Sequence, residues 1–197
     1  MIRMTIREHR KARGWTIRTL AEKTYGQIEV TETEPPVRGW REVEPLTETQ
    51  LITHSDPKVR QPEWDRWYLS TSYQEDKDFA YAPDVALDVL GGGRTRRLYQ
   101  ALVEDQKIAV SASAGAWLSL HDAAPTVLSA SPSEGVSLDD LEEAYMAVVN
   151  DVLANGFTDA EVERSRNSLA ASSIYQRDSQ SSMANLYGST LAIGGTV

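Results

Sequence analysis

The last third of the chain shows the clearest alternation of apolar and polar positions, and it predicts helices. Ser137 with Asp140 is typical of a helix start, and Gly156 is a stop signal after the last turn. Between them the apolar positions recur at helical spacing, at Leu141, Tyr145, Val148, Val149 and Val152. This segment is therefore expected to bury one face against a core.

Two more helices are expected after Gly156. Thr158 and Glu161 have the spacing of a capping box, which predicts a helix from there to about Tyr175. A third helix, over about Ser182–Leu191, places Met183, Ala184, Tyr187 and Leu191 on one face.

Strands are predicted where the pattern has a period of two. Small side chains alternate along Ile108–Ala114, and Pro125–Ser131 is the expected partner strand. Gln50–His54 and Trp64–Tyr73 are two earlier strand candidates, separated by turn-forming residues.

The middle of the chain predicts two helices around a glycine run. Pro83 suits the first turn of a helix that continues to Leu90 and ends at Gly91–Gly93. A short helix over about Thr95–Asp105 is expected directly afterwards.

The N-terminal region differs in composition from the rest. Residues 6–24 are basic and permit helix, with Gly26 as a stop, whereas Glu29–Thr47 is rich in Pro and Glu and predicts an extended connection. Residues 1–24 carry a net charge of +5, which leaves −14 on the remainder of a chain whose total is −9. An acidic body repels nucleic acid, so only the first segment is suited to contact phosphate.

Composition excludes several other classes of protein. The 41% hydrophobic and 25% charged residues are typical of a globular chain, and no apolar run approaches the ~18 residues that span a bilayer. No membrane span is expected. With no Cys, neither disulfides nor thiolate metal ligands are available. The N-terminus lacks the apolar stretch of a secretory signal.

An ordered set of segments resembles the second domain of pitrilysin/insulinase-type zinc peptidases of the bacterial branch related to the mitochondrial processing peptidase. The segments are Asp56–Pro62, Leu90–Tyr99, Leu102–Ala109 and Tyr187–Gly188, and their order and spacing agree over roughly residues 19–197. The resemblance implies an α+β fold, in which helices pack on one face of an antiparallel sheet. Such a domain is half of a metalloenzyme clamshell of the kind found in LuxS and the processing peptidases.

The resemblance also implies the organisation of the chain. Residues 1–18 are an unmatched basic segment, residues 19–46 are the end of a helix followed by a Pro-rich linker, and residues 47–197 are the inactive second domain. In the family that domain continues for some tens of residues past Val197. Family members in bacteria are often periplasmic or attached to the cell envelope, but nothing in these residues indicates export.

A catalytic zinc site is not expected in this chain. Such a site needs about three His, Asp or Glu ligands and a general base, and only His9, His54 and His121 are present. Thr5-Ile6-Arg7-Glu8-His9 is the nearest approach to HxxEH, but Thr5 stands in place of the first ligand. No catalytic residue and no metal ligand is predicted, and the family's zinc is expected in a catalytic domain or subunit outside this chain.

The glycine run is the one candidate binding site. Gly91, Gly92, Gly93 and Arg94, with Arg96 and Arg97 following, stand at a helix start, where exposed amides favour an anion such as a peptide carboxylate. The structural alternative is a tight turn between helices that needs glycine. No Lys-Ser/Thr follows the run, which argues against nucleotide phosphate.

Two further features follow from the family resemblance. Where the partner half of a clamshell peptidase supplies an Arg and a Tyr seven residues apart, this chain has Val103 and Val110. The chain therefore resembles the second domain attached to a zinc-bearing domain, as part of a chamber that encloses an unfolded peptide, in a homodimer or a heterodimer. The aromatic residues near the strands, Trp64, Trp67, Tyr68, Tyr73 and Trp117, are assigned to core packing, with an exposed edge strand as the alternative.

Two other functions remain open. The same family contains catalytically dead subunits that bind peptides or support assembly, and the sequence does not distinguish these from a detached domain of an active enzyme. Residues 6–24 also resemble the first helix and the start of the second in helix-turn-helix repressors, but the Pro-rich, acidic segment that follows does not suit a recognition helix.

Overall fold

A three-stranded antiparallel sheet forms the centre of the computed structural model, which describes residues 10–24 and 47–194. The strand order is β1-β3-β2, with β1 at Trp64–Ser70, β2 at Ala109–Ala116 and β3 at Ala124–Pro132. The pairing of β2 with β3 is the one expected from sequence, and β1 lies on the other side of β3.

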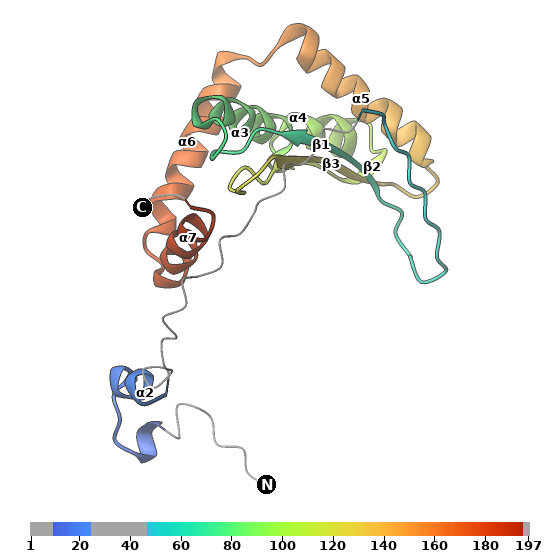
Figure 1. Cartoon of the computed structure of the whole chain (residues 1–197). Coiled ribbons are helices and arrows are strands. Elements are labelled where there is room, and N and C mark those ends of the chain that lie inside the picture. The colour runs from blue at the N-terminus through green and yellow to red at the C-terminus, as the bar shows by residue number, and fades with distance from the viewer. Residues whose placement is uncertain (1–9, 25–46, 195–197) are drawn as a thin grey trace. The chain divides into compact units, whose positions relative to one another are not determined.

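Helices cover one side of this sheet (Figure 1). These are α3 (Lys77–Gly91), α4 (Arg97–Tyr99) with the π-helical turn η1 (Gln100–Asp105), and α5 (Leu138–Asn155). The helices α6 (Asp159–Gln176) and α7 (Gln180–Ala192) complete the chain order. The α+β class and the helices on one face of an antiparallel sheet are thus confirmed.

Local capping signals place three of the helices. Ser137 accepts a hydrogen bond from the amide of Asp140 at the start of α5, and both bonds of the capping box between Thr158 and Glu161 are made at the start of α6. Gly156, at φ 74°, ends α5 in a conformation that glycine adopts at no steric cost. The predicted third helix is found as α7, where Ser179 accepts from the amide of Ser182.

Two predictions made from the sequence are wrong in detail. The segment Gln50–His54 is not a strand, and Leu51 and Ile52 are exposed, because no strand among the described residues pairs with it. Pro83 does not lie in the first turn of its helix, because Asp76 caps α3 earlier by accepting from the amide of Phe79. The missing amide of Pro83 then falls inside the helix.

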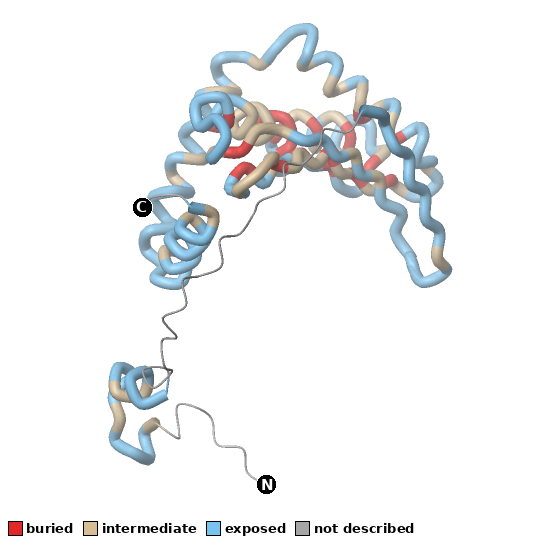
Figure 2. The backbone as a smooth tube through the Cα atoms, viewed as in Figure 1, coloured by how far each residue is buried: buried red, intermediate tan, exposed pale blue. Residues whose placement is uncertain are grey.

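The core lies between the sheet and the helices that cover it (Figure 2). Alanine fills the sheet side, at Ala112, Ala114 and Ala130, and leucine fills the helix side, at Leu90, Leu98, Leu102 and Leu141. Tyr145 of α5 is fully buried, packs on Trp64 with ring centroids 4.9 Å apart, and donates its hydroxyl to the carbonyl of Ser113 at 2.6 Å. Burial raises the pKa of this hydroxyl.

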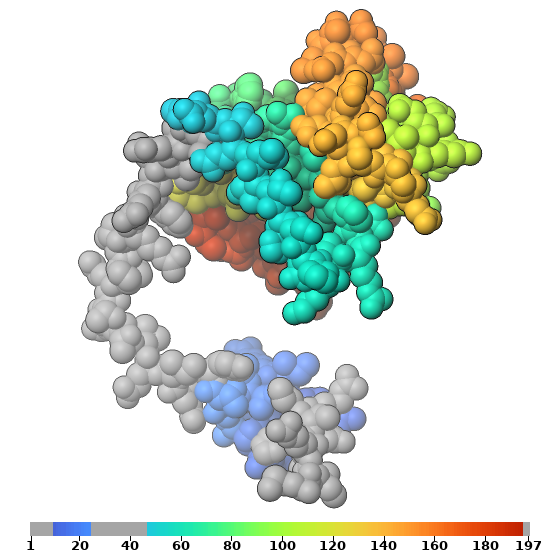
Figure 3. Space-filling view, turned by 90° about the vertical axis from the view of Figure 1, so that its right-hand side faces the viewer, coloured from blue at the N-terminus to red at the C-terminus, as the bar shows by residue number. Residues whose placement is uncertain are grey.

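Residues 47–63 run as an exposed band across the surface before entering β1 (Figure 3). Gln61 donates to the carbonyl of Pro132 at 3.1 Å, and Arg66 of β1 pairs with Glu142 of α5 at 3.2 Å. These contacts hold β1 to the end of β3 and to α5.

The N-terminal part forms a separate unit. The chain divides into two compact units, Met1–Arg41 and Glu42–Val197, and within the first a helical turn at residues 10–12 precedes α2 (Ile17–Thr24). Gly14, at φ 62°, makes the turn between them, and Thr16 accepts from the amide of Thr19 at 3.0 Å. Gly26 and most of the expected Pro-rich connection lie outside the described residues. None of the described helices is long and apolar enough to cross a membrane.

We predict that Gly91→Ala destabilises the fold by about 1–3 kcal/mol, the range of an overpacked core. An added Cβ would overlap the backbone nitrogen of Ala114 and lie 2.8 Å from its Cβ. Urea unfolding measures the effect. Gly115→Ala is the matched control, because a Cβ there has no atom within 4 Å, and an equal loss in both variants would contradict the prediction.

A second prediction concerns the pair that joins α4 to α6. The Arg97 guanidinium donates to both carboxylate oxygens of Glu161 at 2.7 and 2.8 Å and lowers the pKa of Glu161 from 4.5 to about 2. Since the folded pKa lies below the unfolded one, this stabilisation is present above about pH 4.5 and is lost as the pH falls towards 2.

The variant Glu161→Gln keeps the helix cap and removes the charge. We expect it to lower the free energy of unfolding by about 1–2 kcal/mol at neutral pH and to converge with the wild type in acid. Chemical denaturation across this pH range tests it. Glu163→Gln on the same helix should show no such convergence, because Asn167 is the one described residue that donates to this carboxylate.

Candidate functional site

The glycine-rich turn lies between the end of α3 and the start of α4. Gly91 is buried against the backbone of β2, and the amide of Gly92 caps α3 by donating to the carbonyl of Asp88 at 2.9 Å. Gly93 has a φ of 155°, and its carbonyl accepts from the amide of Arg96 at 3.1 Å. Gly91 and Gly92 thus have packing and capping roles, and of the three glycines Gly93 alone has a positive φ, the property expected of a tight turn.

The three arginines after the glycine run have different surroundings. Arg96 is 8% exposed and pairs with Asp88 of α3 at 2.6 Å, while Ser165 of α6 donates to the same carboxylate oxygen at 2.6 Å. Arg97 pairs with Glu161 of α6. Arg96 and Arg97 therefore form ion pairs that join α4 to α3 and α6, and the spacing of residues in the sequence does not indicate these pairs.

Arg94 differs from the other two because it is exposed. Its guanidinium lies 5.7 Å from the centroid of the Tyr99 ring, and its carbonyl accepts from the side chain of Gln100 at 2.8 Å. None of the described carboxylates forms an ion pair with it. Of the predicted residues, Gly92, Gly93 and Arg94 are exposed, whereas Gly91 is buried.

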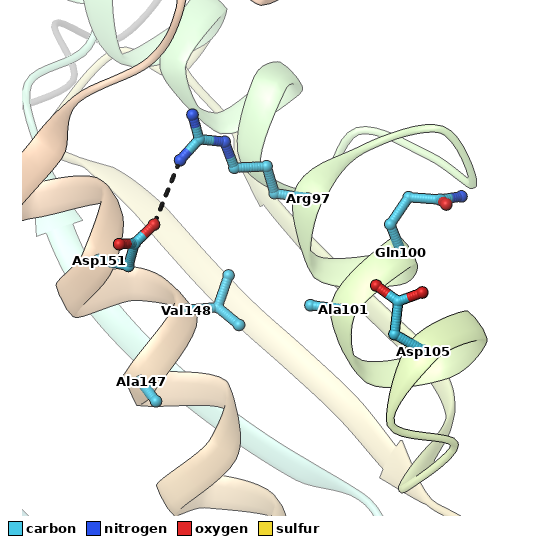
Figure 4. A pocket seen from close by; sticks show the side chains of 7 residues that line it. All are labelled: Arg97, Gln100, Ala101, Asp105, Ala147, Val148 and Asp151. Carbon is cyan, nitrogen blue, oxygen red and sulfur yellow. Dashed lines mark ion pairs between the residues drawn. The ribbon is translucent and has the colours of Figure 1, made fainter.

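A groove of about 540 Å³ lies next to this turn, between α4, η1 and α5 (Figure 4). Ala101 and Val148 face each other across its floor, and Arg97 reaches over one end towards Asp151 of α5 at 3.5 Å. Gln100 and Asp105 form the outer rim. The charges around the groove are of both signs, and Arg97 is held by two carboxylates, so the described lining of the groove offers no unpaired cation.

The two described histidines, His54 and His121, lie in different parts of the fold. His54 is exposed in the band that precedes β1, whereas His121, in the β2–β3 connection, has its Nδ1 2.8 Å from the carbonyl oxygen of Ile193. His9 lies outside the described residues. Within residues 10–24 and 47–194, no group of three or more His, Asp or Glu side chains is arranged to hold a metal ion.

Val103 and Val110, the two valines that the family resemblance singled out, lie on different surfaces. Val103 of η1 is half-buried against the core, and Val110 of β2 is exposed. Neither side chain can donate a hydrogen bond to a reacting carbonyl.

The side of the sheet opposite the helices has a surface that the sequence analysis missed. Trp67 of β1 and Trp117, directly after β2, were assigned to the core, but they are 55% and 58% exposed and their rings contact edge to face. Trp64 does enter the core. The alternation of side chains along a strand could have predicted this difference. Trp64 and Trp67 are three residues apart in β1, so their side chains point to opposite faces of the sheet.

Comparison with known proteins assigns the fold. Residues 16–169 match the family model described as the Peptidase M16 inactive domain. No curated protein matches the chain. A crystal structure of a protease from Helicobacter pylori is similar at 21% identity and a TM-score of 0.61, over 69% of this chain and 32% of that one.

Two Bordetella structures are similar in the same way. The inactive peptidase domain of a putative zinc protease from Bordetella parapertussis has 20% identity and a TM-score of 0.60, over 68% of this chain and 72% of that one. A putative zinc protease from Bordetella pertussis Tohama I has 20% identity and a TM-score of 0.58, over 70% and 74%. These likenesses support the fold, and the family model covers most of the sequence: the chain belongs to the Peptidase M16 inactive-domain family.

Proposed function

We propose that this chain acts as a non-catalytic domain of a zinc metallopeptidase. It supports a zinc-bearing domain carried elsewhere, and it forms part of the wall of a chamber that encloses an unfolded peptide. The observation that carries the proposal is the match of residues 16–169 to the inactive-domain family. In this proposal residues 47–197 are the domain itself and residues 19–46 connect it to what precedes it.

The side chains available support a non-catalytic role. Hydrolysis by zinc needs about three ligands, an open position for water and a general base. The described His, Asp and Glu residues do not cluster in that way. In this proposal Val103 and Val110 take the positions where a partner half would supply polar groups, and neither side chain can donate a hydrogen bond. The zinc therefore belongs, in this proposal, to the partner domain or subunit.

The sheet gives such a domain a suitable inner surface. Helices fill one side of the sheet, whereas the other side presents tryptophan, serine and glycine residues from all three strands. A wall of a peptide chamber needs a surface of this kind, because an unfolded peptide offers both apolar side chains and unpaired backbone groups.

The glycine-rich turn is proposed as a contact for the carboxyl terminus of the peptide. Gly91 and Gly92 fix the end of α3, and Gly93 and Arg94 then present a backbone turn and a guanidinium to solvent. A guanidinium binds a carboxylate through two parallel hydrogen bonds, which favours Arg94 as the recognising group.

We expect the purified chain to bind no stoichiometric zinc and to leave a quenched fluorogenic peptide uncut. Elemental analysis after incubation with zinc and desalting measures the first, and a fluorescence assay the second. Addition of a zinc-bearing HxxEH domain of the same family from the same genome should give cleavage that a chelator abolishes, above the rate of that domain alone. Zinc-dependent cleavage by this chain alone would contradict the proposal, and co-elution of the two proteins without cleavage would favour a scaffold subunit.

For the turn, we predict that Arg94→Gln weakens binding of a peptide with a free carboxyl terminus by roughly three- to tenfold, as expected for one exposed charge-assisted pair. The same peptide with a C-terminal amide should bind wild type and variant equally. Fluorescence anisotropy measures both. Arg164→Gln, a change of an exposed arginine on α6, is the matched control. An equal effect of Arg94→Gln on the peptide with a free carboxyl terminus and on the amidated peptide would contradict the assignment.

A further inference from the structure

The open side of the sheet contains a hollow of about 380 Å³. Its position follows from the strand register, which places Trp67, Val127 and Gly115 in one row across the sheet. In the neighbouring row Asp65, Ser129 and Ser113 lie side by side in the same way. Residues from all three strands and from the start of the β2–β3 connection line it: Asp65, Trp67, Ser113, Ala114, Gly115, Ala116, Trp117, Val127 and Ser129.

Two tryptophans form the apolar wall of this hollow. Trp67 lies in the edge strand β1 and Trp117 directly follows the other edge strand, β2; their ring centroids are 5.5 Å apart at an interplanar angle of 67°. Both therefore lean over the central strand β3. More than half of each side chain remains exposed, and large exposed aromatic surfaces of this kind mark places where a ligand or partner binds.

The floor beside the tryptophans is low because its side chains are small. Gly115 has no Cβ, and a Cβ built there would have no atom within 4 Å, so the space above this residue is open. Ser113 and Ser129 add hydroxyls to the floor. Small residues thus leave open space next to the indole rings.

The charge around the hollow is negative. Asp65 is the one charged residue in its lining, and it forms no ion pair within the part of the chain that the structure describes. The Glu63 carboxylate lies at the margin, where the hydroxyl of Ser129 donates to it at 3.4 Å. Neither Lys nor Arg is among the described residues that line the hollow.

We propose that this hollow binds the cationic side chain of an extended peptide, with arginine preferred over lysine. Cations are attracted to the indole face, and a planar guanidinium also stacks on it and pairs with a carboxylate. Trp67 and Trp117 supply the aromatic surface, and Asp65 and Glu63 supply the charge. The peptide nature of the ligand rests on the proposed function, which this inference extends to a class of side chain.

The test uses this chain alone and two labelled peptides. One is a short fluorescein-labelled peptide of alternating arginine and alanine, blocked at both ends, and the other replaces each arginine by citrulline, which keeps the shape and removes the charge. Fluorescence anisotropy at low ionic strength should give an affinity for the arginine peptide at least about tenfold higher than the affinity for the citrulline peptide.

Variants of the hollow should act on the arginine peptide in a graded way. Gly115→Leu fills the space and should weaken binding about tenfold, whereas Asp65→Asn should weaken it by roughly two- to fivefold, as expected for an exposed charge. Ser111→Leu is the matched control, because Ser111 lies on the same face of β2 outside the lining. Trp117→Ala removes one aromatic wall and should also weaken binding, whether or not Gly115→Leu folds. Thermal unfolding of every variant shows which of them are folded.

Equal affinity for the arginine and citrulline peptides would overturn the proposal. So would unchanged binding by folded Gly115→Leu and Trp117→Ala. If the chain forms a concentration-dependent dimer that these variants dissociate, the hollow is occupied by a second copy and the peptide assignment is wrong. No zinc domain is present in this assay. A negative result therefore overturns the assignment of arginine as the ligand of the hollow, and it leaves the proposed support of a catalytic partner as a separate question.

Discussion

The close approach of α3 to β2 is the contact on which the rest of this domain depends. The C-terminal residue of α3, Gly91, lies directly against the backbone of Ser113 and Ala114, at a distance that only glycine permits. Alanine on the helix side of the strand allows the same proximity along the neighbouring surface. Leu98 and Leu102 can then pack into the layer between helix and sheet, where both are fully buried.

The same approach decides the position of the turn that follows. Directly after this contact Gly92 caps α3, and Gly93, at φ 155°, continues the turn towards α4. Asp88 holds this geometry from within α3 by pairing with Arg96, and it also accepts from Ser165 of α6. One carboxylate therefore links α3 to the start of α4 and to α6, which is distant in sequence, and this polar network stabilises the end of the helix layer.

Small residues in β2 have different consequences on its two sides. On the helix side they make room for leucines, so the core is tightly filled. On the opposite side Ser113 and Gly115 have small side chains or none, which leaves the hollow beside the exposed Trp67 and Trp117. The proposed function assigns the open side of this sheet to contact with the peptide.

The sequence by itself determined the features that depend on neighbouring residues. The caps of α5 and α6, the two small-residue strands and the glycine stop after α3 are local, because each is set by side chains within a few positions of the backbone groups they satisfy. Tertiary structure decided the rest. It left Gln50–His54 without a strand partner, buried Arg96 while Arg94 stayed exposed, and brought Trp67 and Trp117 together across the sheet, because pairing, desolvation and ring contacts depend on residues far away in the chain.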